Sequence, residues 1–162
     1  MNIPQSAHEF EVHAALTLKR AEDLYAELVE NGSQLLAADV LQKFDTVSRV
    51  IEQISAPASL FSNVSPDEEL RTKSEEFEQQ AHQLYTKISL DKKLFEILNS
   101  LDVSKCSALE QRLHTHIIRD YRRSGVDKDD ATRERITALN AELVEIGQKF
   151  ERNIRGCSLD KN

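Results

Sequence analysis

The residues most suited to chemistry in this sequence are histidines that lie close to glutamates. One cluster, His8-Glu9-Phe10-Glu11-Val12-His13, lies near the start of the chain. Helical zinc peptidases use His-Glu-x-x-His, because two imidazoles one turn apart face a single ion and the glutamate acts on the zinc-bound water. His8 and His13 are five positions apart, which places them well round a helix from each other. We therefore interpret this cluster as an exposed polar helix start.

Three further pairs have a glutamate and a histidine four positions apart, the spacing at which two side chains share one face of a helix. Carboxylate-bridged di-iron bundles use Glu-x-x-His together with glutamates on facing helices, and these pairs do not repeat that pattern. His116 follows His114 by two positions, so the two point to opposite sides of a helix. A metal-binding bundle enzyme is thus a minor hypothesis beside small stabilising surface pairs. The three pairs are Glu9 with His13, Glu78 with His82, and Glu110 with His114.

Nucleophile and phosphate motifs are missing from the sequence. No Gly-x-Ser-x-Gly elbow occurs, and the four glycines are scattered singly rather than gathered in a phosphate loop. Cys106 and Cys157 are far apart and fit no metal-ligand pattern, which favours a reducing compartment, although a disulfide between them stays open. We expect no catalytic, cofactor-binding or metal-binding residue in this chain.

Composition indicates one helical domain over residues 1–162, alone or as part of a larger protein. Charged residues make up 30% of the chain, aromatic residues 6%, and only four Gly and three Pro occur, which favours long helices. The net charge of −7 argues against a nucleic-acid or anionic-membrane partner. Arg119, Arg122 and Arg123 are interpreted as solvated charges at a helix end. Without an N-terminal signal pattern or a long apolar run, we expect a cytoplasmic protein.

Apolar spacing predicts two long helices in the last third of the chain, joined by a turn at Ser124-Gly125. Gly can end a helix in the left-handed conformation without strain, and Asp129 or Asp130 can cap the next helix. We expect the two helices to pack as a hairpin through their stripes. The first stripe is Leu109, Leu113, Ile117 and Tyr121, and the second is Ile136, Leu139, Leu143, Ile146, Phe150 and Ile154.

The earlier residues predict four more helices. The first runs from a Ser6 cap to about Glu30, and the second runs from about Gln34 to Ser55 and stops at Ala56-Pro57. Residues 58–66 are expected to be a connection, anchored by apolar side chains. The third begins with Ser65 as cap and Pro66 in the first helical position, and reaches about Leu90. The fourth is short and is marked by Leu94, Phe95, Leu98 and Leu101.

Together these patterns predict an all-α protein, an antiparallel bundle of hairpins with about five to six helices. Several apolar residues exceed what one simple hairpin needs. They can belong to the core, to a domain interface or to a homodimer seam, and we expect the core for most of them. They are Leu60, Phe61, Ile117, Ile118 and Ile154.

Two stretches are more specific than helix formation requires. The first is Asn63-Val64-Ser65-Pro66-Asp67-Glu68-Glu69-Leu70-Arg71. The second begins with Asp120-Tyr121-Arg122-Arg123-Ser124-Gly125 and continues through Arg133-Glu134-Arg135-Ile136, Leu139-Asn140-Ala141-Glu142-Leu143 and Phe150-Glu151-Arg152-Asn153-Ile154. In this order they resemble the N-terminal helical region of the thimet oligopeptidase family of zinc metallopeptidases, which includes neurolysin and oligopeptidase A.

The resemblance implies a structural role. In that family this helical region forms a wall and part of the roof of a channel that admits short, unstructured peptides. The zinc and its ligands belong to a catalytic domain beyond this region, so the resemblance assigns no catalytic or metal residue here. The expected partners are that catalytic domain, short peptides in the channel, or a second copy bound through apolar helix faces. The alternative is a free-standing helical interaction module without peptidase activity.

Overall fold

The computed structural model describes residues 6–156, and all regular structure in that range is helical. This confirms the all-α class, and six α-helices lie within the expected number. A short 3-10 turn separates the first two. In chain order the elements are α1 (Ala7–Asn31), η1 (Gly32–Gln34), α2 (Ala37–Val64), α3 (Glu68–Ser89), α4 (Lys92–Asn99), α5 (Ala108–Ser124) and α6 (Asp130–Gly156).

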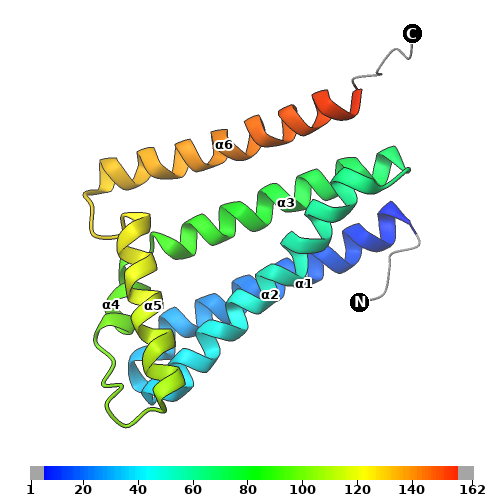
Figure 1. The fold of residues 1–162 in the computed structure, drawn as a ribbon. Coiled ribbons are helices and arrows are strands. Elements are labelled where there is room, and N and C mark those ends of the chain that lie inside the picture. The colour runs from blue at the N-terminus through cyan, green and yellow to red at the C-terminus, as the bar shows by residue number, and fades with distance from the viewer. Residues whose placement is uncertain (1–5, 157–162) are drawn as a thin grey trace.

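The helices form a three-helix body, a cap at one end and an outer helix (Figure 1). α1, α2 and α3 pack against one another and run in alternating directions. The short α4 and the steeply inclined α5 close one end of this body. α6 lies along α3, antiparallel to it, on the side away from α1 and α2. The last helix therefore forms an outer layer of the molecule.

The hydrophobic core lies in the first five helices and the turn that follows them. Its fully buried members include Leu28 of α1, Leu41 and Ile54 of α2, and Leu94 and Leu98 of α4. Helix α3 contributes five apolar side chains to this cluster, namely Leu70, Phe77, Ala81, Leu84 and Ile88. Among the residues that form this core, none comes from the described part of α6. Burial of apolar area is the main stabilising contribution to folding, so α1–α5 carry most of the stability.

Two predicted helix ends, the start of α1 and the end of α5, are confirmed. The Ser6 hydroxyl accepts a hydrogen bond from the Glu9 N–H at the start of α1, as predicted. Gly125 ends α5 with φ of 91°, in the left-handed region. A Cβ at Gly125 would lie 2.7 Å from Ile136 Cδ1, so the absence of a side chain here lets α6 lie close to the end of α5.

The predicted stop of α2 at Ala56-Pro57 is wrong. The helix continues to Val64 with Pro57 inside it, and it starts at Ala37 because the 3-10 turn occupies residues 32–34. An internal proline costs about 3 kcal/mol locally. The continued helix offsets this cost by burial, since Ala58 and Ser62 are almost fully buried and Phe61 meets Phe10 edge to face at 5.8 Å.

The start of α3 is also displaced from the prediction. Asp67, not Ser65, is the cap: its carboxylate accepts from the Glu69 and Leu70 N–H groups at 2.9 and 3.4 Å. Pro66 precedes the helix, and the Arg71 guanidinium binds the Ser65 and Pro66 carbonyls. A carboxylate accepts a stronger hydrogen bond than a hydroxyl and also suits the positive end of the helix dipole.

The predicted hairpin of the last two helices is wrong. α5 and α6 are steeply inclined to each other, and α6 packs on α3 instead (Figure 1). Ile117 and Tyr121 of α5 are buried as predicted, but they face the α1–α4 side of the molecule, and Leu109 is 77% exposed. Helix α4 ends at Asn99, before Leu101.

Candidate docking surface on helix α6

The structure separates the residues that could have carried metal chemistry. His8 and His13 are both exposed on α1. Glu78 of the second pair receives a hydrogen bond from Gln148, whereas His82 is exposed at the edge of a groove. No cluster of His, Cys, Asp and Glu residues that could hold a metal ion occurs among the described residues.

In the third pair each residue has a structural partner. The Glu110 carboxylate accepts from the Ser107 N–H at 2.7 Å, and the Ser107 hydroxyl accepts from the Glu110 N–H, which forms a capping box. Hydrogen bonds from Ser107 lower the pKa of this carboxyl. His114 Nε2 lies 2.8 Å from the Leu98 carbonyl oxygen. Both side chains therefore stabilise helix α5 and its contact with α4.

Cys106 is half-buried before α5, and its predicted alternative partner Cys157 lies outside the described residues. Desolvation, and then the nearby Glu110 and Asp102 carboxylates, raise the pKa of the Cys106 thiol above its usual value of 9.0. A thiol must lose its proton to act as a nucleophile, so this environment is the opposite of an activated cysteine.

The arginines at the end of α5 are exposed, as predicted. Arg119 forms an ion pair with Asp120 at 2.9 Å, and Arg122 donates to the Asn99 side chain. Both Arg122 and Arg123 lie in the last turn, where the helix dipole favours cations. Within residues 6–156 the longest helices are too polar for any of them to cross a lipid bilayer.

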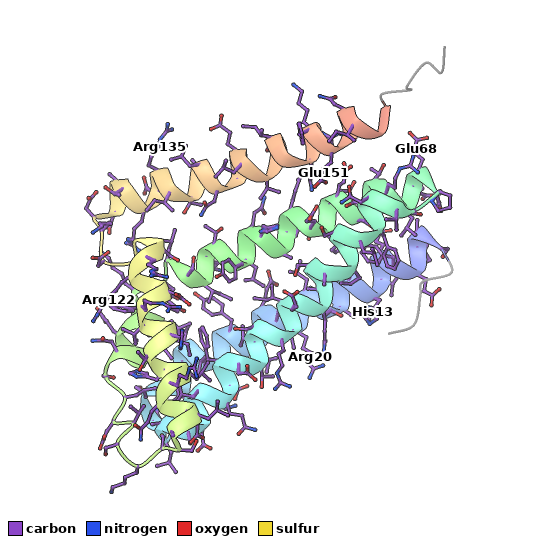
Figure 2. All side chains as sticks on the ribbon, in the orientation of Figure 1. His13, Arg20, Glu68, Arg122, Arg135 and Glu151 are labelled. Carbon is purple, nitrogen blue, oxygen red and sulfur yellow. The ribbon has the colours of Figure 1, made fainter. Side chains whose placement is uncertain are left out.

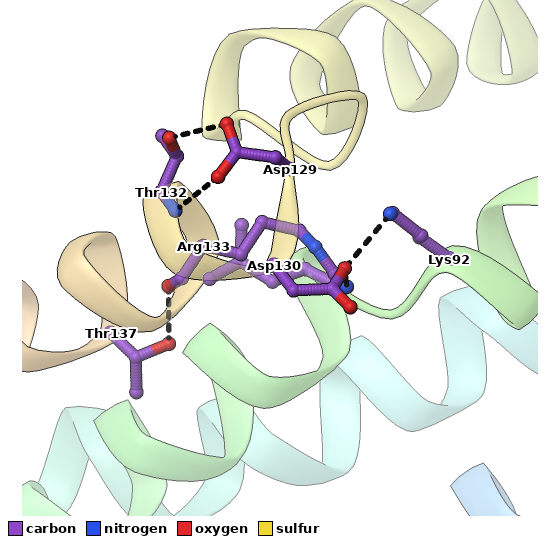
Figure 3. Close-up of polar contacts among 7 residues, drawn as sticks. Lys92, Asp129, Asp130, Thr132, Arg133 and Thr137 are labelled. Atoms are coloured by element: carbon purple, nitrogen blue, oxygen red, sulfur yellow. Dashed lines mark hydrogen bonds and ion pairs between the residues drawn. The ribbon is translucent and has the colours of Figure 1, made fainter.

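α6 is attached to the body at its first turn by charged groups (Figure 3). The Asp129 carboxylate accepts from the Thr132 N–H at 2.9 Å and from its hydroxyl at 2.7 Å. The Arg133 guanidinium donates to the Leu90 carbonyl at 3.0 Å and to Asp130 at 2.6 Å. Hydrogen bonds from Arg133 and then Lys92 lower the pKa of the Asp130 carboxyl. Asp129 thus fills the predicted capping role, and Asp130 joins α6 to α4.

The middle of α6 is held to α3 by a buried glutamine. Gln148 is only 4% exposed, and its amide donates to the Glu75 carbonyl at 3.1 Å and to the Glu78 carboxylate at 3.0 Å. Its own oxygen accepts from the Gln79 amide at 2.6 Å. One turn later Arg152 pairs with Glu75 at 2.5 Å. The contact between α6 and α3 is therefore largely polar in its second half.

The apolar stripe of α6 points away from this contact. Ile136, the first residue of the predicted stripe, is half-buried near the Gly125 turn. The other five members are 39–65% exposed; Leu139 is the least exposed, and Leu143 and Phe150 are the most exposed. Figure 2 shows Arg135 on the outer side of the helix and Glu151 on the side toward α3. We call the outer face formed by Leu139, Leu143, Ile146, Phe150 and Ile154 the α6 surface.

The expectation that surplus apolar residues belong to the core holds for Ile117 and Ile118, which are buried. It fails for Leu60 and Ile154, which are 52% and 60% exposed. Phe61 is partly buried against Phe10. Exposing a row of large apolar side chains to water is unfavourable in free energy. A continuous exposed row is therefore typical of a surface that another protein covers.

A groove of about 530 Å³ lies between α6 and α3, and Leu143 of the α6 surface is among the residues that line it. Its lining includes polar side chains such as Gln83, His82 and Asn140 from the two helices, and Arg123 from the end of α5. Among the described residues, no hydrogen bond or ion pair joins these four side chains to one another. The α6 surface is therefore the stronger candidate for a functional site.

The spacing of apolar residues in the sequence predicts the stripe on α6 but not the side of the molecule to which it points. The missing signal was Gln148, a polar residue on the face opposite the stripe that becomes the buried contact with α3. A single glutamine in a helix rich in charged residues does not indicate a buried position. Comparison with known proteins adds no relative: no protein-family model matches the chain, and no curated protein matches it.

Proposed function

We propose that this chain is a non-catalytic helical domain that docks onto another folded protein through the α6 surface. One observation carries the proposal. A long helix is fixed to the body by polar contacts of the half-buried Arg133 and the buried Gln148, and it holds its row of large apolar side chains outward. An apolar stripe held outward on a braced helix is suited to helix-to-surface packing.

The sequence resemblance supplies the candidate partner. We infer that the α6 surface packs against the catalytic part of a thimet-like zinc oligopeptidase, in the cytoplasm, where this domain forms a wall of the channel for short peptides. Zinc and the water-activating groups belong to that catalytic part. The role of this chain is to exclude bulky substrates by its volume, and by itself it does not hydrolyse peptides.

A peptide-cleavage assay tests the proposal. The chain is incubated with a quenched short peptide and zinc, first alone and then with the catalytic part of a thimet-like oligopeptidase added separately. We expect no cleavage alone and increased cleavage on mixing. Leu143→Glu should abolish the increase, whereas Leu109→Glu, at a 77% exposed position on α5, should not. Chelator-sensitive cleavage by the pure chain would overturn the non-catalytic role.

The second candidate is a free-standing interaction module without any link to peptidases. It is favoured by the position of the core, whose described members come from α1–α5 and the turn up to Val126, so that the α6 surface is available to a different partner. If mixing leaves cleavage unchanged while Leu143→Glu still alters the association of the chain in solution, this candidate replaces the oligopeptidase role.

A further inference from the structure

The α6 surface has the spacing of a helix that pairs with another helix. Leu139, Leu143, Ile146 and Phe150 follow one another at intervals of four, three and four residues. This is the a and d pattern of a coiled coil, in which apolar knobs insert between side chains of a facing helix. α6 is the outermost helix in Figure 1, so a long helix can approach along its outer face. The spacing therefore specifies a helical occupant.

The row is complementary to itself when two copies run in opposite directions. Leu143 then lies in one layer with Ile146 of the second copy, and Leu139 lies in one layer with Phe150 of the second copy. The two-fold axis repeats both layers, so all four seam positions meet an apolar partner. Gly147 lies beside the seam with open space around it, which allows the two backbones to approach closely.

Charges beside the seam select this antiparallel arrangement. Glu142 and Lys149 are one heptad apart on the same edge of the seam, and both are exposed. In the antiparallel pair Glu142 faces Lys149 of the second copy, and the symmetry axis repeats the contact. In a parallel pair Glu142 would face Gly147 and Lys149 would face Ile154, so neither charge would meet its opposite.

We propose that two copies of this chain associate through their α6 surfaces as an antiparallel helix pair, with two Glu142–Lys149 ion pairs across the interface. The inference rests on the proposed docking role, because it names a second copy as an occupant of the same surface. A copy and a catalytic partner cannot bind there together, so self-association masks the surface until the other partner displaces it.

Sedimentation equilibrium of the full chain over a wide range of concentrations tests the inference. The average mass should rise from 18.4 kDa toward twice that value. Glu142→Lys or Lys149→Glu alone places like charges opposite each other and should weaken the dimer about tenfold. The double variant should return to within about threefold of the natural sequence, since both ion pairs re-form with exchanged signs.

Mixing the two single variants gives the sharpest readout. One copy then carries lysine at 142 and 149 and the other carries glutamate at both, so the mixed dimer has two ion pairs and should form better than either variant alone. Glu134→Lys is the matched control: it makes the same charge change at an exposed position of α6 away from the seam and should leave association unchanged.

A mass of 18.4 kDa at every concentration would overturn the inference. Equal effects of Glu142→Lys and Glu134→Lys, or no gain on mixing, would overturn the antiparallel pairing. The docking role is judged separately by the cleavage assay. A monomer that still increases cleavage contradicts only the self-association, and a dimer that never increases cleavage contradicts only the oligopeptidase role.

Discussion

Tyr25 and Tyr121 carry the same hydroxyl group, but its contribution to the stability of the fold differs between the two positions. Both lie near Asp91, which caps α4 by accepting from the Leu94 N–H at 3.1 Å. The Tyr25 hydroxyl donates to this carboxylate, whereas the buried Tyr121 hydroxyl has no hydrogen-bond partner among the described residues. Burial, and then the hydrogen bond to Asp91, raise the pKa of Tyr25. Burial is also the main cause of the raised pKa of Tyr121.

Tyr25→Phe should therefore lower the free energy of unfolding by about 1–2 kcal/mol, since it removes a donor to a carboxylate that is part of a helix cap. Tyr121→Phe is the matched control and should be neutral or slightly stabilising, because it deletes a buried hydroxyl without a partner. Urea unfolding of both variants measures the difference. Equal losses in the two variants would contradict this reading of the site.

At the scale of elements, α6 is unusual because its contact with α3 depends on polar groups. Gln148 makes three hydrogen bonds from a position that is 4% exposed. A buried polar group stabilises a contact only while its partners are present, and removing one leaves the others desolvated and unsatisfied. The attachment of α6 is thus specific in position, which keeps the α6 surface turned outward.

Gln148→Ala should weaken the attachment of α6 by about 1–3 kcal/mol, because the Gln79 amide and the Glu78 carboxylate each lose a hydrogen bond. Hydrogen exchange measures the weakened attachment directly. The backbone amides of α6 should exchange faster, while those of α2 stay protected. Gln83→Ala, at an exposed position of α3, is the control and should change neither. Uniform loss of protection in all helices would contradict a local role for Gln148.

For the molecule as a whole, the stability of α1–α5 depends little on α6. Within the part of the chain that the structure describes, the members of the main core cluster lie between Ala7 and Val126, ahead of α6. Val126 is fully buried although it follows the last turn of α5, so the boundary lies after this residue. A domain can remain folded after a peripheral helix is removed, provided that the helix contributes no residue to the core of the domain.

Truncation after Lys128 should therefore leave a cooperative fold of α1–α5. We expect a lower thermal midpoint, because the contacts of α6 with α3 and the link from Arg133 to Leu90 are lost, together with loss of any concentration-dependent mass. Circular dichroism on heating and sedimentation equilibrium measure the two effects. A truncated chain that unfolds without a cooperative transition would show that α6 is part of the core.

What could be predicted from the sequence was the class of fold and some of the helix ends that depend on near neighbours; at the start of α3, two candidate caps lie two residues apart, and Asp67 rather than Ser65 fills the role. Ser6, Gly125 and Asp129 were identified because a cap acts on groups within about four residues. The seven residues after Pro57 were misread, since Ala58 and Ser62 become buried through contacts with helices far away in the chain.

The sequence by itself determined that α6 is a long amphipathic helix, because the spacing of Leu139 to Ile154 is a property of the chain alone. Only the tertiary structure decided which face of that helix is covered. The Gly125 turn sends α6 along α3 rather than back along α5, and there Gln148 and Arg133 find partners from distant helices. The local sequence pattern determines which residues form the apolar and polar faces of a helix. Contacts with neighbouring helices determine which of the two faces is buried.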